Sequence, residues 1–162
     1  QICTINDKIL SKPITMDNAI KQLSTLSGNT HKQTSAISLY YNNELIWSYA
    51  EEALLTMHKL NSDEIIKYLE LDQPFNSCGS YKYESLGCHL FSKVVGQSET
   101  IQGFPIIPLL KQLRKNKLYS LITMGMIPHT IESWRDISSM GVMAIIRAAG
   151  RYRDTILAVL PL

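Results

Sequence analysis

A lysine and a glutamate two residues apart mark the part of this sequence best suited to chemistry. Lys82 and Glu84 lie in the stretch GSYKYESLG, at positions 79–87. In a β-strand, residues two apart point to the same face, so Tyr81 and Tyr83 would pack inward while the charged pair faces a ligand or solvent. A surface ion pair on a half-buried strand has the same pattern. Spacing alone favours that structural interpretation over a functional one.

The composition describes an ordinary globular chain. Its 162 residues are 45% hydrophobic and 19% charged, and the formal net charge is +2. This length suits one domain with its own core. The small charge gives no indication of a nucleic-acid partner, and no apolar run is long enough to predict a membrane span.

The metal-binding residue types are scattered. Three cysteines without a Cys-x-x-Cys pair predict a reduced, cytoplasmic protein rather than a disulfide framework or zinc site. The histidines also have no partner at helical ligand spacing, so a metal here would be a hard ion of the magnesium type held by oxygen ligands. These residues are Cys3, Cys78, Cys88, His31, His58, His89 and His129.

Three helices carry start signals that would position these residues. Thr15 precedes an amphipathic helix that runs to about Leu26. Asn61 and Glu64 form a capping-box-like start for a second helix. A third helix opens at Gly103-Phe-Pro105, with proline near its start and a buried apolar stripe expected along it.

Strands are expected between these helices. The β-prone runs are 1–10 with a turn at Asn6-Asp7, 34–41, 45–57 and 88–95. The two middle runs flank Asn42-Asn43-Glu44, which indicates an antiparallel hairpin. The alternation of strands and helices predicts an α/β domain with a mixed β-sheet flanked by helices.

The last part of the chain differs in character. After a break at 124–128, an amphipathic stretch runs from 131 to 160. Arg147, Arg151 and Arg153 interrupt it too often for a membrane span. We predict a domain at 1–117 and an atypical, helical C-terminal extension at 118–162. No chemistry is assigned to this extension.

The motifs, taken in order, resemble those of the Maf family of nucleoside triphosphate pyrophosphatases. The matching segments are QICTINDKILSKP (1–13), AIKQLSTLSGNT (19–30), LNSDEIIKYL (60–69), CGSYKYESLGCHLF (78–91) and GFPIIPLL (103–110). The resemblance covers about residues 1–117 and implies a Maf/ITPase-like fold. It implies hydrolysis of a nucleoside triphosphate between the α- and β-phosphates, with a divalent cation (Mg or Mn), and favours a homodimer.

The resemblance also assigns roles to single residues. Lys12 matches the lysine of the family's Gly-Lys-Pro motif, with Ser11 in place of the glycine, and is expected to contact phosphate in catalysis; otherwise it is a solvated loop lysine. Gln1 directly follows the family's aspartate position and is expected to bind substrate. Lys82 and Glu84 match a subgroup similar to 7-methyl-GTP pyrophosphatases, in which a carboxylate would accept hydrogen bonds from a guanine edge.

Several family features have no counterpart in this sequence. The Ser-x-Arg-Arg loop, an upstream glutamate and lysine, and the aspartate before Gln1 are absent, and Ser85 stands where glycine is usual. The other acidic residues receive structural assignments, with Asp72 placed in a loop. We therefore expect an N-terminally truncated family domain with an exposed sheet edge.

Two alternatives stay open at this stage. The chain is an inactive remnant acting at most as a nucleotide-binding or interaction module, or it is a generic α/β module unrelated to nucleotides.

Overall fold

The computed structural model of the protein describes residues 1–41, 44–116, 143–146 and 156–159. The chain forms two compact units. The first comprises Gln1–Thr34 and Glu52–Gly103, and the second comprises Ser35–Glu51 and Phe104–Leu162. The residues with predicted site roles all belong to the first unit. In the described part of the chain, no helix is long and apolar enough to cross a membrane.

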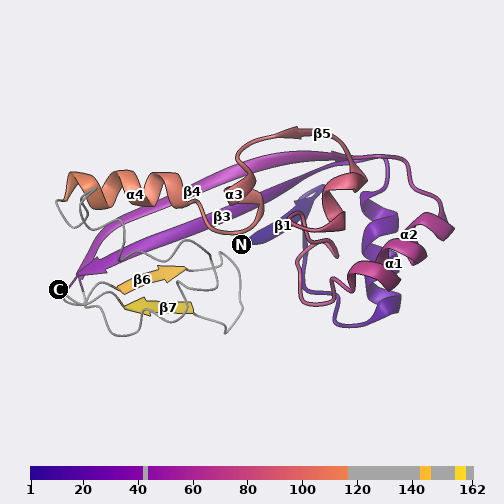
Figure 1. Ribbon diagram of the computed structural model, residues 1–162, viewed down its shortest axis with the longest axis horizontal. Coiled ribbons are helices and arrows are strands. Elements are labelled where there is room, and N and C mark those ends of the chain that lie inside the picture. Colours follow the sequence, from indigo (N-terminus) through magenta and orange to yellow (C-terminus); the bar gives the residue numbers. More distant parts are fainter. Residues whose placement is uncertain (42–43, 117–142, 147–155, 160–162) are drawn as a thin grey trace. The chain divides into compact units, whose positions relative to one another are not determined.

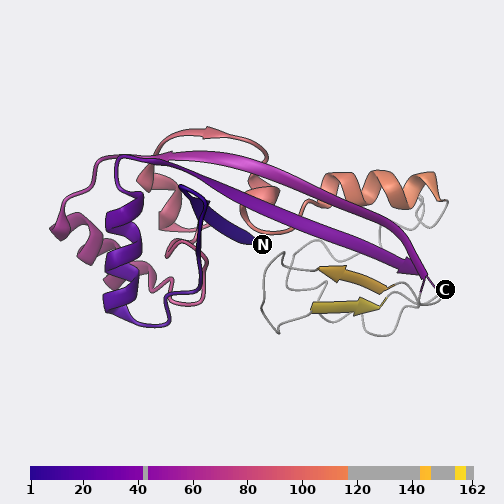
Figure 2. The same cartoon turned by 180° about the vertical axis from the view of Figure 1, so that it is seen from behind.

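The strands form a sheet in the order β2-β1-β3-β4-β5, with β6 paired to β3 and β7 paired to β6. Their bounds are β1 Ile2–Ile5, β2 Lys8–Leu10, β3 Thr30–Tyr41, β4 Glu44–Met57, β5 Phe91–Val95, β6 Met143–Ile146 and β7 Ile156–Val159. The neighbouring strands β3 and β4 are long and run alongside each other (Figure 2).

The α/β class is confirmed, but the predicted mixed sheet is corrected to antiparallel pairing. Every described register is antiparallel, namely β1 with β2 and β3, β3 with β6, β4 with β5, and β6 with β7. Asn6 and Asp7 join β1 to β2 with φ angles of 48° and 61°, as a type I′ hairpin turn requires. Such a connection is too short for the crossover that parallel pairing needs.

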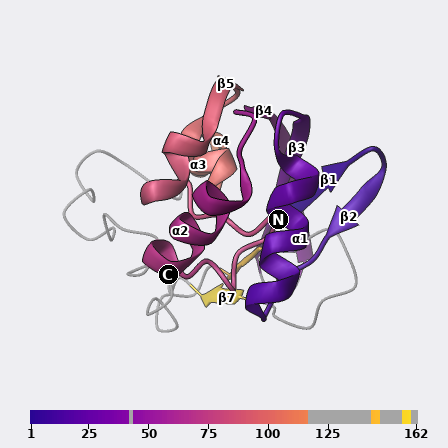
Figure 3. The same ribbon diagram turned by 90° about the vertical axis from the view of Figure 1, so that its right-hand side faces the viewer.

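Two helices of the first unit begin where the sequence predicts. Helix α1 spans Met16–Leu26, and the Thr15 side chain accepts a hydrogen bond from the Asn18 backbone N–H at 3.3 Å. Helix α2 spans Ser62–Asp72 with a complete capping box between Asn61 and Glu64. The two helices contact each other (Figure 3).

The core of the first unit is mainly apolar, with buried polar side chains at a few positions, two of them on β3. Its buried side chains include Ile5, Leu23, Leu26, Leu55, Met57, Leu69 and Tyr81. His31 and Gln33 also point inward from β3, and each is only 2% exposed. Two short elements complete this unit, a 3₁₀ helix η1 at Leu86–Leu90 and α3 at Ser98–Ile101.

The second unit packs helix α4, Ile106–Lys115, through Leu109 and Leu113 onto Ile37 and Leu39 of β3. The helix is confirmed, but its buried apolar stripe is narrower than predicted. Ile107, one of the apolar residues expected in that stripe, is 60% exposed. The described parts of the C-terminal extension are strands β6 and β7 (Figure 1), so the predicted helix is wrong there. The rest of the predicted helix lies outside the described residues.

Candidate functional site

The segment at 79–87 is a turn rather than the predicted strand. The backbone N–H groups of Ser85 and Gly87 both donate to the carbonyl oxygen of Lys82, at 3.2 and 3.0 Å. The first bond closes a β-turn from Lys82 to Ser85, with Tyr83 and Glu84 at its centre. The strand prediction is wrong because these backbone groups find partners within the segment and in α2, instead of in a neighbouring strand.

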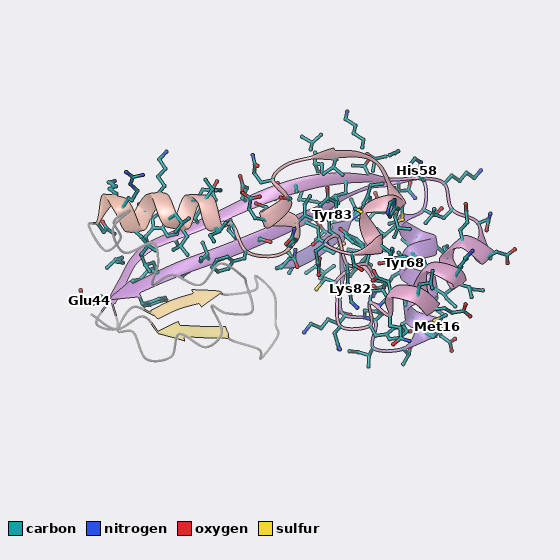
Figure 4. The ribbon with its side chains drawn as sticks, in the orientation of Figure 1. Met16, Glu44, His58, Tyr68, Lys82 and Tyr83 are labelled. Carbon is teal, nitrogen blue, oxygen red and sulfur yellow. The ribbon has the colours of Figure 1, made fainter. Side chains whose placement is uncertain are left out.

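Lys82 is fastened to α2. Its ammonium Nζ donates to the backbone carbonyl of Asp72 at 2.6 Å, and its backbone N–H donates to the hydroxyl of Tyr68 at 3.1 Å. Figure 4 shows Tyr68, Lys82 and Tyr83 in the same region of the first unit. A cation at a helix C-terminus offsets the negative end of the helix dipole, so Lys82 has a structural role.

Glu84 lies at the tip of the turn and is exposed, whereas Tyr83 is partly buried against the core. The ring of Tyr83 lies 6.1 Å from that of Phe91, centroid to centroid. Burial raises the pKa of Tyr68, and the carboxylates of Asp72 and Glu84 raise it further. The charge of Glu84 therefore acts on the Tyr68 hydroxyl, while the exposed carboxylate of Glu84 remains accessible to a ligand.

The loop that carries Lys12 is tied to the segment before this turn. Gln22 of α1 donates from Nε2 to the carbonyl oxygen of Ser11 at 2.8 Å, and its Oε1 accepts from the Ser80 hydroxyl at 2.6 Å. The Ile14 N–H also donates to the Phe75 carbonyl at 3.0 Å. The structure thus joins the Gly-Lys-Pro-like loop to the glycine-bounded segment.

Lys12 itself is exposed. Burial raises the pKa of the Cys78 thiol, and the ammonium of Lys12 opposes that increase. The charge of Lys12 therefore acts on the same segment that leads into the turn.

Gln1 is placed beside α3. Its side-chain amide donates to the backbone carbonyl of Ile101 and, at 3.5 Å, to that of Thr100. The Cys78 thiol lies 4.0 Å from the Gln1 carbonyl oxygen. Gln1 is thus next to the same segment as Lys12, but its amide is engaged with the protein backbone.

A buried polar cluster supports the turn from the sheet side. The Tyr81 hydroxyl lies 2.9 Å from His31 Nε2 and accepts from Gln33 Nε2 at 2.8 Å. Within the described residues, His31 Nδ1 and Gln33 Oε1 are buried without a hydrogen-bond partner. Burial lowers the pKa of His31 to about 4. The i, i+2 spacing of His31 and Gln33 on a strand was the available signal for this cluster, which the sequence analysis missed.

Tyr68 and Asp72 are further residues that the sequence analysis did not assign to the site. Asp72 is the last residue of α2 and is 7% exposed, which corrects its predicted place in a loop. Its Oδ2 accepts from the Tyr68 hydroxyl at 2.8 Å, and its Oδ1 accepts from the Ser85 hydroxyl at 2.7 Å. The signal in the sequence was the i, i+4 spacing of the two residues on a helix.

The acidic residues that the structure describes do not gather into a metal-binding group. Across the described residues, no three His, Cys, Asp or Glu side chains lie together in a way that could hold a metal ion. The residues described do not fit the divalent cation that the resemblance implies. We therefore assign it no ligands and no chemical step.

The protein is thus an α/β protein whose first unit holds the loop of Lys12 and the segment that leads into the turn of Glu84 together through bonds to α1. A family model described as Maf-like protein matches residues 1–116. The chain therefore belongs to the Maf-like family.

Similar proteins carry nucleotide pyrophosphatase names. A "Nucleoside triphosphate pyrophosphatase" of Legionella pneumophila (strain Paris) is 36% identical over 121 residues, which are 75% of this chain and 60% of that protein. One with the same name from Rhodopseudomonas palustris (strain HaA2) is 38% identical over 120 residues, 73% and 59% of the two chains. A "7-methyl-GTP pyrophosphatase" of Brucella suis biovar 1 (strain 1330) is 37% identical over 119 residues, 72% and 60% of the two chains. The chain thus spans about 60% of the length of these curated relatives.

Proposed function

We propose that this chain carries the base- and phosphate-recognition groups of a nucleoside triphosphate pyrophosphatase. The reaction hydrolyses the bond between the α- and β-phosphates and gives the nucleoside monophosphate and pyrophosphate. The observation that supports this most is the Gln22 bridge, because it joins the Lys12 loop to the segment that presents Glu84. Membership of the Maf-like family, with relatives named as such enzymes, supports the same assignment.

Lys12 is proposed to bind the phosphates. It is exposed on a loop that is held at Ser11 and Ile14 by bonds to α1 and to the 74–80 segment. A lysine ammonium is a compact point charge with three donors, which suits a polyphosphate whose charge grows on the leaving group.

Glu84 is proposed to select the base. Its exposed carboxylate offers two acceptor oxygens, which match the N–H donors on the Watson–Crick edge of guanine. Methylation at N7 makes the ring cationic, and a negative side chain favours a cation over a neutral ring. Together with the Brucella relative named 7-methyl-GTP pyrophosphatase, this supports 7-methyl-GTP as the preferred substrate.

The remaining site predictions receive narrower support. One N–H of the Lys82 ammonium donates to the Asp72 carbonyl. We propose that its two other N–H donors bind the substrate. The substrate contact of Gln1, the divalent cation, the homodimer and the cytoplasmic setting stay predictions.

The decisive assay is pyrophosphate release from 7-methyl-GTP, GTP, UTP and dTTP, with Mg or Mn and with a chelator. It should be run on this chain and on a version extended at its N-terminus with the upstream segment of the Legionella relative. Release from the extended version with a preference for 7-methyl-GTP is the expected result. Calorimetry that shows nucleotide binding without release by either version would support the inactive-module alternative, and neither binding nor release would reject the proposal.

Two substitutions with matched controls test the residue roles in the same assay. Glu84→Gln should lower the preference for 7-methyl-GTP over GTP, whereas Glu70→Gln, at an exposed glutamate of α2, should not. Lys12→Ala should weaken the binding of all four nucleotides alike, and Lys8→Ala on the exposed face of β2 should leave it unchanged. An unaltered base preference in Glu84→Gln would reject the role given to that carboxylate.

A further inference from the structure

The end of helix α2 departs from a basic rule of helix electrostatics. Asp72 is the last residue of α2, and the last turn of this helix contains no basic residue. A carboxylate at the negative end of the helix dipole is unfavourable for the helix. Asp72 is also 7% exposed, so its charge is largely removed from water. An acid that is unfavourable for its own helix indicates a role in what surrounds it.

What surrounds Asp72 is the turn that carries Glu84. The carboxylate accepts one hydrogen bond on each oxygen, from Tyr68 to Oδ2 at 2.8 Å and from Ser85 to Oδ1 at 2.7 Å. Its backbone carbonyl accepts from the Lys82 ammonium at 2.6 Å. Asp72 thus reaches both ends of the four-residue turn, the first through Lys82 and the last through Ser85.

Tyr68 completes the attachment of the turn. Its hydroxyl accepts from the Lys82 backbone N–H at 3.1 Å and donates to Asp72. Burial, together with the neighbouring carboxylates of Asp72 and Glu84, raises the pKa of Tyr68. The phenol therefore keeps its proton, and the chain of bonds from Lys82 through Tyr68 to Asp72 is maintained at neutral pH.

Serine at position 85 suits this arrangement better than glycine would. Ser85 has a φ of −119°, outside the left-handed region that calls for glycine. Its hydroxyl supplies the bond to Asp72, which a glycine cannot make. The residue that needs to be glycine is Gly87, because a Cβ there would overlap the Lys82 carbonyl oxygen.

We infer that Asp72 and Ser85 form a positioning pair that fixes the turn at 82–85 and so determines how Glu84 meets the base of the nucleotide. This inference rests on the proposed function and names the residues that set its base preference. Glu84 makes the contact, whereas Asp72 and Ser85 act through it. With the pair intact, both ends of the turn are held and the carboxylate is presented in one orientation. Without it, Glu84 samples several orientations and distinguishes bases less well.

The first test needs no nucleotide. Amide hydrogen exchange is measured on the unaltered chain and on Ser85→Ala, Ser85→Thr and the control Ser92→Ala, which removes a hydroxyl bonded to the Thr56 carbonyl of β4. Ser85→Ala should speed exchange at 82–87 by roughly threefold to tenfold, the equivalent of one lost hydrogen bond. Ser85→Thr keeps the hydroxyl and should restore protection, while Ser92→Ala should leave these amides unchanged. Unchanged exchange at 82–87 in Ser85→Ala would overturn the positioning role.

The second test measures dissociation constants for 7-methyl-GTP and GTP by calorimetry on the same variants and on Asp72→Asn. In Ser85→Ala the dissociation constant for GTP divided by that for 7-methyl-GTP should fall toward one, by roughly threefold to tenfold. In Ser85→Thr this ratio should return to the value of the unaltered chain. Faster exchange with an unaltered ratio would overturn the link to base preference. Absence of nucleotide binding by both the unaltered chain and the version extended at its N-terminus would reject the proposed function and this link together, while the exchange result still decides the positioning of the turn. Both tests can be decided with Ser85→Ala alone, so they remain informative if Asp72→Asn does not fold.

Discussion

Acid should destabilise this protein through one buried imidazole. His31 is 2% exposed, with Nε2 at 2.9 Å from the Tyr81 hydroxyl and Nδ1 without a hydrogen-bond partner among the described residues. Burial lowers its pKa from 6.5 to about 4. Tyr81 does not titrate in this range, because burial raises its pKa well above the ordinary value. A proton added to His31 therefore creates an uncompensated charge in the core.

The size and direction of the effect follow from linkage. An unfolded histidine takes up its proton near pH 6.5, whereas the folded protein resists protonation of His31 down to about pH 4. Between these values the unfolded state binds more protons, so the free energy of unfolding decreases as the pH falls. The contribution is fully present above pH 6.5 and is lost as the pH drops toward 4. A gap of about 2.5 pH units corresponds to roughly 3 kcal/mol.

Urea unfolding followed by circular dichroism between pH 4 and 7.5 measures this loss. His31→Gln should flatten the dependence over that window, whereas His89→Gln, at an exposed histidine, should keep it. NMR titration of the imidazole carbons in the unaltered chain gives an independent reading if His31→Gln does not fold. A His31 that titrates near 6.5, or a pH dependence that survives in His31→Gln, would refute the reasoning.

Three further outcomes are expected in denaturant unfolding at pH 7. Gly87→Ala should lower the unfolding free energy by about 1–3 kcal/mol, because its Cβ would lie 2.7 Å from the Lys82 carbonyl carbon. The control Leu86→Ala, at a neighbouring side chain that is 41% exposed, should lower the unfolding free energy less. Equal losses in the two variants would contradict the overlap at Gly87. Asn61→Ala breaks the capping box of α2 and should cost about 1 kcal/mol, so an unchanged midpoint would dispute the cap. Glu52→Gln removes a 3.0 Å ion pair with Lys32 whose side chains are both over 40% exposed, and should change stability by less than about 1 kcal/mol.

The helix starts were predictable because their signals are local. Thr15 accepts from a backbone N–H three residues ahead, and Asn61 and Glu64 bond each other across the same spacing. Such contacts form within one turn of chain and do not depend on how the rest of the protein folds. The turn at Asn6 and Asp7 was predictable for the same reason, since both residue types tolerate positive φ.

The shape of the candidate site was not predictable in this way. The alternation of tyrosines with Lys82 and Glu84 suits a strand as well as it suits the observed turn. The turn forms because Lys82 bonds to residues 10 and 14 positions earlier in the chain, which the local pattern does not show. Asp72 was assigned to a loop because nothing near it in sequence shows that its oxygens are taken by Tyr68 and Ser85. The association of the Lys12 loop with the 74–80 segment was not predicted, because no periodicity in the sequence indicates the bonds that join them.

The Gln22 side chain connects two loops that are distant in sequence, because Ser11 lies 11 positions before Gln22 and Ser80 lies 58 positions after it. Its amide nitrogen donates to one loop and its amide oxygen accepts from the other. Rotating the amide by half a turn would break the bond to Ser11, whose carbonyl oxygen can only accept. The Lys12 loop and the Ser80 segment are therefore both held by the same side chain of α1 and are expected to move together. We expect the proposed nucleotide, by restraining either loop, to restrain the other as well, so that the entropy of ordering the two loops is lost once rather than twice.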